Sequence, residues 1–133
     1  MSNSQIRKIH ADNLPKPVGP YSPATGFKRL VFVSGQAGRD PATGLTAAGI
    51  EAQTEQTLRN VETILKAAGT DLQHVLRCGV FLMDMAEFPK MNAVYERMFA
   101  GHKPARTTVQ VAGLPGEDLR VEIDCIAVRP EKA

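Results

Sequence analysis

Two segments of the chain are apolar at almost every position. Residues 30–33 read Leu-Val-Phe-Val before Ser34 and Gly35, and residues 75–83 are interrupted only by Arg77 and Gly79. Successive side chains of a strand point to opposite faces of its sheet, so strands with this composition need apolar contacts on both faces. Both segments therefore predict inner strands of a sheet that must be covered on each side.

Two other segments have the periodicity of amphipathic helices. Across residues 47–68, apolar positions recur three and four apart while charged residues occupy the remaining face. Gly69 then supplies the left-handed conformation that ends many helices. A second helix is predicted to begin at residues 84–87, where Asp84 and Glu87 have the spacing of a capping box, and to end at Gly101.

Residues 14–23 contain four prolines. Proline lacks the backbone N–H that a helix interior or an inner strand requires, so neither element fits this stretch. Composition leaves open whether it is an ordered loop or a loose linker. A short strand is predicted before it, over residues 6–10.

The last third of the chain alternates between apolar and polar residues. Thr107, Val109 and Val111 share one face, residues 113–118 have the composition of a turn, and residues 119–127 alternate again. This pattern predicts two strands paired as a hairpin. The whole chain then indicates an α/β (α+β) fold, with one mixed sheet and two helices on one of its faces. We expect residues 1–133 to form a single domain.

Composition argues against several classes of protein. The chain has 16 Lys and Arg against 14 Asp and Glu, with two Tyr, five Phe and no Trp. Such a charge balance and so few aromatic side chains argue against an extended nucleic-acid contact. We find no run of about 18 apolar residues and no signal-peptide pattern, and therefore expect no membrane contact and a cytoplasmic location.

The residues that commonly bind metals are scattered. Cys78 and Cys125 lie in apolar runs without a Cys-x-x-Cys spacing, and we interpret both as small core residues. His10, His74 and His102 are not spaced as a ligand pair. We expect no metal and no cofactor.

Charged residues occupy one face of the last predicted strand. Alternation places Arg120, Glu122 and Asp124 opposite Leu119 and Val121. An exposed polar face would explain this pattern. However, the apolar inner strands would leave a large apolar surface uncovered in a two-layer chain, so we expect a homo-oligomer packed through the open face of the sheet.

Arg106 stands at the start of the preceding strand, and the predicted hairpin would bring it near Glu122. A guanidinium matches a carboxylate through two parallel hydrogen bonds. The residues alone leave two roles open for Arg106: an ion pair with Glu122, or a binding group for a carboxylate ligand.

Several short motifs together carry a family resemblance that covers nearly the whole chain. They are Gly19-Pro20-Tyr21-Ser22-Pro23, Val33-Ser34-Gly35-Gln36, Asp40-Pro41-Ala42-Thr43-Gly44, Asn60-Val61, Met91-Asn92-Ala93-Val94-Tyr95, Pro104-Ala105-Arg106-Thr107, Leu114-Pro115 and Val121-Glu122-Ile123. In this order and spacing they resemble the RidA/YjgF family, which is also called the endoribonuclease L-PSP family.

The resemblance implies a chorismate-mutase-like fold and a homotrimer with active clefts between its subunits. It also implies the hydrolysis of 2-imino acids such as 2-iminobutanoate and 2-iminopropanoate, or of their enamine tautomers, to 2-keto acids and ammonia. Three alternatives stay open: a pathway-specific deaminase of an aminoacrylate or aminomuconate type, a non-catalytic sensor of small carboxylates, and an endoribonuclease or translation inhibitor.

The resemblance also implies roles for individual residues. Arg106 matches the arginine that binds the substrate carboxylate, and Glu122 matches the acid that positions the attacking water. Tyr21 matches a tyrosine that lines the cleft. Ser34 and Gly35 match positions of the pocket wall.

Two further positions belong to the expected substrate pocket, and the chain departs from the family pattern near them. Asn92 matches a motif position, and Thr108 stands where many deaminating members carry Cys. Asp124 stands where many carry Glu, and residues 37–39, Ala-Gly-Arg, replace a more apolar segment. These departures leave the substrate preference open.

Overall fold

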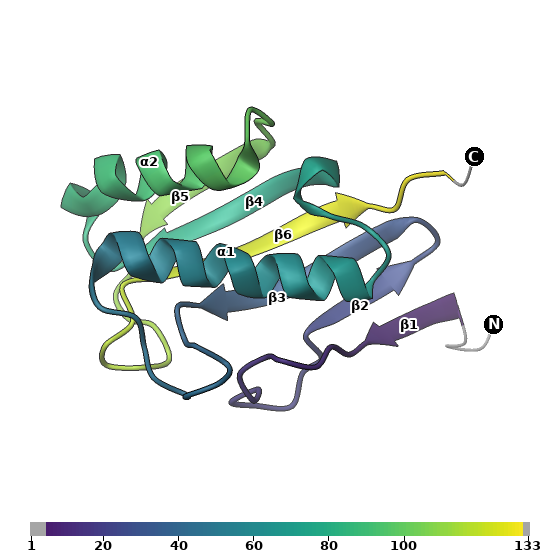
Figure 1. Cartoon of the computed structure of the whole chain (residues 1–133), viewed down its shortest axis with the longest axis horizontal. Helices are drawn as coiled ribbons and strands as arrows, with labels where there is room; N and C mark the ends of the chain where they lie inside the picture. The colour runs from purple at the N-terminus through teal and green to yellow at the C-terminus, as the bar shows by residue number, and fades with distance from the viewer. Residues whose placement is uncertain (1–4, 132–133) are drawn as a thin grey trace.

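A six-stranded sheet forms the centre of the computed structural model, which describes residues 5–131. The strand order is β1-β2-β3-β6-β4-β5, and every neighbouring pair is antiparallel except β4 and β5, which are parallel (Figure 1). The strands are β1 (Ile6–Ile9), β2 (Ala24–Phe27), β3 (Leu30–Ala37), β4 (Val75–Leu82), β5 (Ala105–Gln110) and β6 (Val121–Val128).

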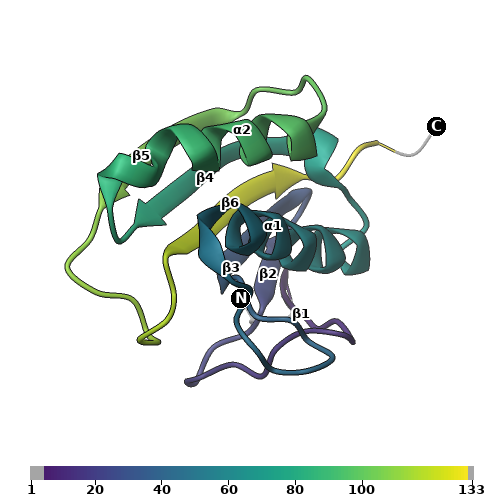
Figure 2. The ribbon, with the colours of Figure 1, turned by 60° about the vertical axis from the view of Figure 1, so that its left-hand side comes forward.

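Two α-helices, α1 (Gly49–Ala67) and α2 (Phe88–Phe99), pack against each other on one face of this sheet (Figures 1 and 2). Single 3-10 turns, η2 (Leu72–His74) and η3 (Met85–Glu87), precede β4 and α2. The apolar stripe of α1 is fully buried; it includes Leu58, Val61, Ile64 and Leu65. The predicted mixed sheet with two helices on one face is confirmed.

The alternation predicted for β6 is also confirmed, and it separates an apolar face from a charged one. Val121 and Ile123 are buried in the core beneath the helices, whereas Glu122 and Asp124 are half-buried on the opposite face. No helix of the described residues covers that second face (Figure 2). Large apolar side chains remain exposed on it: Leu30, Phe32 and Val109. A single chain therefore covers its inner strands on one side only.

The predicted hairpin between the last two strands is wrong. β4 lies between β5 and β6, so that Cys78 is the register partner of both Arg106 and Cys125. The connection from β4 to β5 contains α2, and a strand–helix–strand unit of this kind joins parallel neighbours. Alternation decides which face a residue occupies but does not decide which strand lies beside it.

Two local features also differ from the sequence-based expectation. The sequence did not predict β2, because its four residues are too few to show alternation. This strand pairs with β3 through a tight turn in which Lys28 has a φ of 53°. Asp84 accepts a hydrogen bond from the Ala86 N–H (2.9 Å) and caps η3, so that α2 begins only at Phe88.

Asn60 ties α1 to the segment that follows β3. Its buried side-chain amide donates to the carbonyl oxygens of Ala37 and Arg39, both at 3.0 Å, while its own carbonyl accepts from Gln56 at 3.0 Å. Carbonyl groups that are partly shielded from water need such partners. Asn60 therefore fixes the backbone that carries Arg39.

We predict that Asn60→Ala lowers the free energy of unfolding by about 2 kcal/mol, because it leaves two interior carbonyl groups without a donor. Urea unfolding followed by circular dichroism measures the change. The matched control is Arg59→Ala on the same helix, whose exposed ion pair with Glu55 (2.9 Å) contributes little. Equal shifts of the unfolding midpoint in the two variants would contradict this role.

Candidate functional site

The candidate site residues divide between two regions on opposite faces of the sheet. Arg106 is in register with the buried Cys78 and faces α2. Glu122 is in register with Phe81 and Ala37 and faces away from the helices. One chain therefore does not bring Arg106 and Glu122 together, and the ion pair that the hairpin would have allowed is absent between these two described residues.

Arg106 lies in the first region, a hollow of about 740 Å³ beside α2. Its guanidinium carbon lies 4.7 Å from the centre of the Tyr95 ring and 5.4 Å from that of Phe88. Aromatic faces attract a cation without using its N–H donors. Within residues 5–131 no acceptor engages the guanidinium, so its donor fork is held in place and remains free for a ligand.

Asn92 lines the same hollow, and its side-chain oxygen is buried without a hydrogen-bond donor among the described residues. Most buried oxygens have a hydrogen-bond donor, so this one is available to a donor from outside residues 5–131. Thr108 lies two residues beyond Arg106 on the same face of β5 but does not line the hollow. Arg106 and Asn92 are thus brought together, and Thr108 flanks them.

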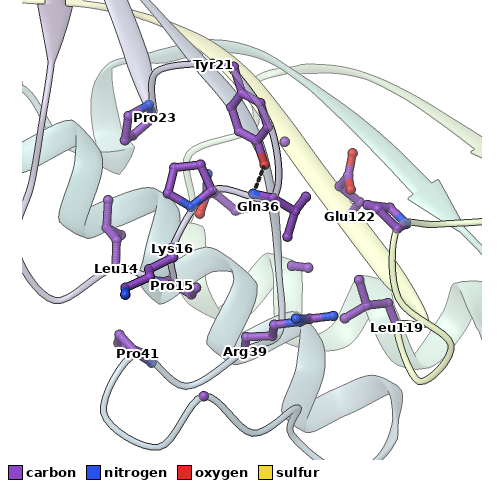
Figure 3. Close-up of a pocket in the computed structure, with 16 residues that line it drawn as sticks. Leu14, Pro15, Lys16, Tyr21, Pro23, Gln36, Arg39, Pro41, Leu119 and Glu122 are labelled. Carbon is purple, nitrogen blue, oxygen red and sulfur yellow. Dashed lines mark hydrogen bonds between the residues drawn. The ribbon is translucent and has the colours of Figure 1, made fainter.

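The second region is a cavity of about 550 Å³ between the proline-containing loop, β3 and the loop that precedes β6. Tyr21, Gly35 and Glu122 line it together, so three of the candidate residues meet here (Figure 3). The Tyr21 hydroxyl accepts a hydrogen bond from the Val18 N–H (3.3 Å), and the Tyr21 side chain is largely exposed.

Gly35 fits in the wall of this cavity because it has no side chain. The carboxylate of Glu122 occupies the space that a Cβ on Gly35 would take. Ser34 does not line the cavity. Its hydroxyl instead donates to the Ser22 carbonyl oxygen at 2.7 Å and attaches the proline-containing loop to β3.

Glu122 is a half-buried carboxylate without a hydrogen-bond donor or a cation among the described residues. Burial raises its pKa above the ordinary value of 4.5, and the nearby negative charge of Asp124 raises the pKa further. Asp124 itself accepts from the Gly79 N–H at 2.9 Å. A carboxyl with a raised pKa and free oxygens is suited to accepting and returning a proton.

The two cysteines belong to the core, as predicted. Both are buried, and burial raises the pKa of Cys78 to about 11 and that of Cys125 further still. Because thiolate is the nucleophilic form, neither thiol is reactive near neutral pH.

Within residues 5–131, no group of three or more His, Cys, Asp and Glu side chains lies close enough to hold a metal ion. Neither α-helix in this range combines the length and hydrophobicity needed to cross a bilayer.

The sequence of the chain matches a known family along most of its length. A sequence model of the family described as Endoribonuclease L-PSP matches residues 11–129. The chain belongs to this family, the RidA/YjgF family. The resemblance seen in the short motifs is therefore confirmed.

Several RidA/YjgF relatives match over nearly their whole length. Protein DfrA of Myxococcus xanthus is 46% identical over 125 residues, which are 92% of this chain and 95% of that protein. The 2-iminobutanoate/2-iminopropanoate deaminase of Mus musculus is 43% identical over 129 residues, 96% of this chain and 95% of that protein.

Solved RidA/YjgF structures have the same fold. The crystal structure of the E. coli YjgF gene product superposes with a TM-score of 0.88 at 38% identity, covering 93% of this chain and 99% of that one. The structure of E. coli TdcF with bound serine also gives a TM-score of 0.88, at 36% identity and with the same two coverages.

Three charged or amide side chains of the second cavity were not among the candidates from the sequence: Lys16, Gln36 and Arg39. The departure of residues 37–39 from the family pattern was the one signal that pointed to Arg39. Its place in the cavity depends on the direction of the chain after β3, which no local pattern specifies.

We predict that Asp124→Asn lowers the pKa of Glu122, because removal of the neighbouring negative charge makes loss of the Glu122 proton easier. Burial remains, so the pKa stays above 4.5. Carbon-13 NMR titration of the labelled carboxyl group measures the shift. Glu117→Gln, in the exposed loop before β6, is the control and should leave the pKa of Glu122 unchanged. If Asp124→Asn also left the pKa of Glu122 unchanged, the coupling between Asp124 and Glu122 would be refuted.

Proposed function

We propose that this chain hydrolyses 2-imino acids, or their enamine tautomers, to 2-keto acids and ammonia, with 2-iminobutanoate and 2-iminopropanoate as substrates. The observation that carries the proposal is the pair of unpaired charges, a free guanidinium at Arg106 and a free carboxylate with a raised pKa at Glu122. The names of the mouse relative and of the human relative, 38% identical over 130 residues, support the same reaction.

In this proposal the active site forms between copies of the chain in a homotrimer. Arg106 of one copy meets Tyr21, Gly35 and Glu122 of its neighbour, because a single chain holds these groups on opposite faces of its sheet. β5 is an edge strand, which leaves Arg106 near the boundary of the chain. The exposed apolar side chains of the open sheet face supply surface for such an association.

The reaction needs orientation and one proton carrier. Arg106 binds the substrate carboxylate in a bidentate manner, and the rings of Phe88 and Tyr95 fix the guanidinium. Glu122 accepts a proton from water as the water oxygen bonds to the carbon of the protonated imine, which gives a carbinolamine. Glu122 then returns this proton to the nitrogen. As the carbon–nitrogen bond breaks, Glu122 accepts the proton of the new hydroxyl group, the carbonyl of the 2-keto acid forms, and ammonia leaves and takes up that proton.

The remaining candidates have supporting roles. The Tyr21 hydroxyl accepts a backbone hydrogen bond and keeps its own proton for a substrate or water oxygen. Gly35 leaves room for the Glu122 carboxylate. Asn92 and Thr108 flank Arg106 on the side that would meet the neighbouring copy.

We expect Arg106→Ala to lower kcat/KM for imine hydrolysis by about a hundredfold, because the substrate carboxylate loses its charged partner. The assay generates 2-iminobutanoate in situ and follows the competition between hydrolysis and trapping by semicarbazide. Arg59→Ala, on the exposed face of α1, is the control and retains full activity. Saturable binding of 2-keto acids without any turnover by the unaltered protein would favour a sensor instead.

A mixing experiment tests whether the site lies between copies. Arg106→Ala and Glu122→Gln are each expected to keep about a hundredth of the activity or less, yet a trimer containing both variants has an interface at which Arg106 and Glu122 are intact. Random assembly from equal amounts should restore about a quarter of the original activity, since one interface in four receives both residues. A co-expressed mixture that stays as inactive as its components would rule out the shared site.

A further inference from the structure

Arg39 is a second arginine whose guanidinium has no partner. Within residues 5–131, only Arg39 and Arg106 have a guanidinium that makes no hydrogen bond or ion pair. The other arginines donate to acidic side chains, to Thr107 or to backbone carbonyl oxygens. Arg39 is half-buried, and a half-buried cation without an acceptor is suited to an anionic ligand.

The position of Arg39 is fixed by its surroundings. Its carbonyl oxygen accepts from the buried Asn60 side chain at 3.0 Å, and its backbone forms an isolated bridge with Thr46. The guanidinium packs over Gly116, where a Cβ would collide with Nη2. The backbone of Arg39 is therefore fixed and its guanidinium has a packing contact, which lowers the entropic cost of ordering the side chain when a ligand binds.

Arg39 faces the same cavity as Glu122. The charged side chains that line this cavity of about 550 Å³ are Lys16, Arg39 and Glu122. Tyr21 and Arg39 lie at opposite ends of the view in Figure 3, with Glu122 beside the space between them. Two cations and one carboxylate give the cavity a surplus of positive charge. Its volume is in the range of small-molecule sites.

We infer that Arg39 binds the second carboxylate of a dicarboxylic 2-imino acid, such as the imine of an acidic amino acid. This inference rests on the proposed function and names its substrate class. The 2-carboxylate binds Arg106 of the neighbouring copy, the imine carbon lies by Glu122, and the side-chain carboxylate reaches Arg39. Lys16, on the proline-containing loop, adds positive charge at the rim of the cavity.

The choice of arginine matters for this role. The planar donor fork of a guanidinium matches a carboxylate through two parallel hydrogen bonds, and an ammonium group does not reproduce that geometry. A monocarboxylic imino acid leaves Arg39 without a partner, whereas a dicarboxylic one satisfies both free guanidinium groups. The expected preference comes from this difference.

The test compares 2-iminoglutarate with 2-iminobutanoate, each generated in situ from its amino acid and assayed by semicarbazide competition. We expect the unaltered protein to prefer 2-iminoglutarate. In Arg39→Gln the ratio of kcat/KM for the two imines should fall about tenfold to a hundredfold, the effect of losing hydrogen bonds to a charged group. Arg39→Lys should retain part of the preference, and Arg59→Gln should keep the original ratio.

The outcomes separate this inference from the proposed function. Hydrolysis of both imines with a ratio that Arg39→Gln does not change would overturn the role of Arg39 and leave the deaminase proposal standing. If neither imine is hydrolysed, the proposed function fails, and calorimetric binding of 2-oxoglutarate and 2-oxobutanoate decides the inference. Tighter binding of 2-oxoglutarate that is lost in Arg39→Gln supports the second carboxylate site, and equal affinities refute it.

Discussion

The place of β6 between β3 and β4 decides where the charged groups of this chain lie. Burial of Val121 and Ile123 beneath α1 forces Glu122 and Asp124 to the other face, because successive residues of a strand alternate. A register slip by one residue would place both carboxylates in the apolar core, at a large desolvation cost. The hydrophobic packing of one face thus holds the acidic groups of the other.

The two unpaired arginines are placed by different means. Arg106 is held by aromatic rings on α2, which leave its donors free. Asn60 fixes the backbone of Arg39, and Gly116 leaves room for the Arg39 guanidinium because it has no side chain. All other arginines within residues 5–131 donate to acidic side chains, to Thr107 or to backbone carbonyl oxygens. Both guanidinium groups therefore keep their donors available beside a cavity.

The proline-containing loop lines the second cavity because β3 holds it. The Ser34 N–H donates to the Pro23 carbonyl oxygen at 2.9 Å, and the Ser34 hydroxyl donates to the carbonyl oxygen of Ser22. These bonds hold the loop that brings Tyr21 and Lys16 to the lining of the cavity that Arg39 also lines. Ser34 therefore contributes through the loop that it fixes, and its hydroxyl is already engaged.

The sequence by itself determined the elements and their faces. The spacing of Leu58, Val61 and Ile64 specified α1, and the alternation around Glu122 specified the charged face of β6, because burial of apolar side chains follows the period of each element. The motifs around Tyr21, Arg106 and Glu122 specified the family. Only the tertiary structure decided the strand order, which separates Arg106 from Glu122, and the course of the chain after β3, which places Arg39 and Glu122 on the lining of one cavity. Strand neighbours and cavities arise from contacts between residues far apart in the chain, and a local pattern does not contain that information.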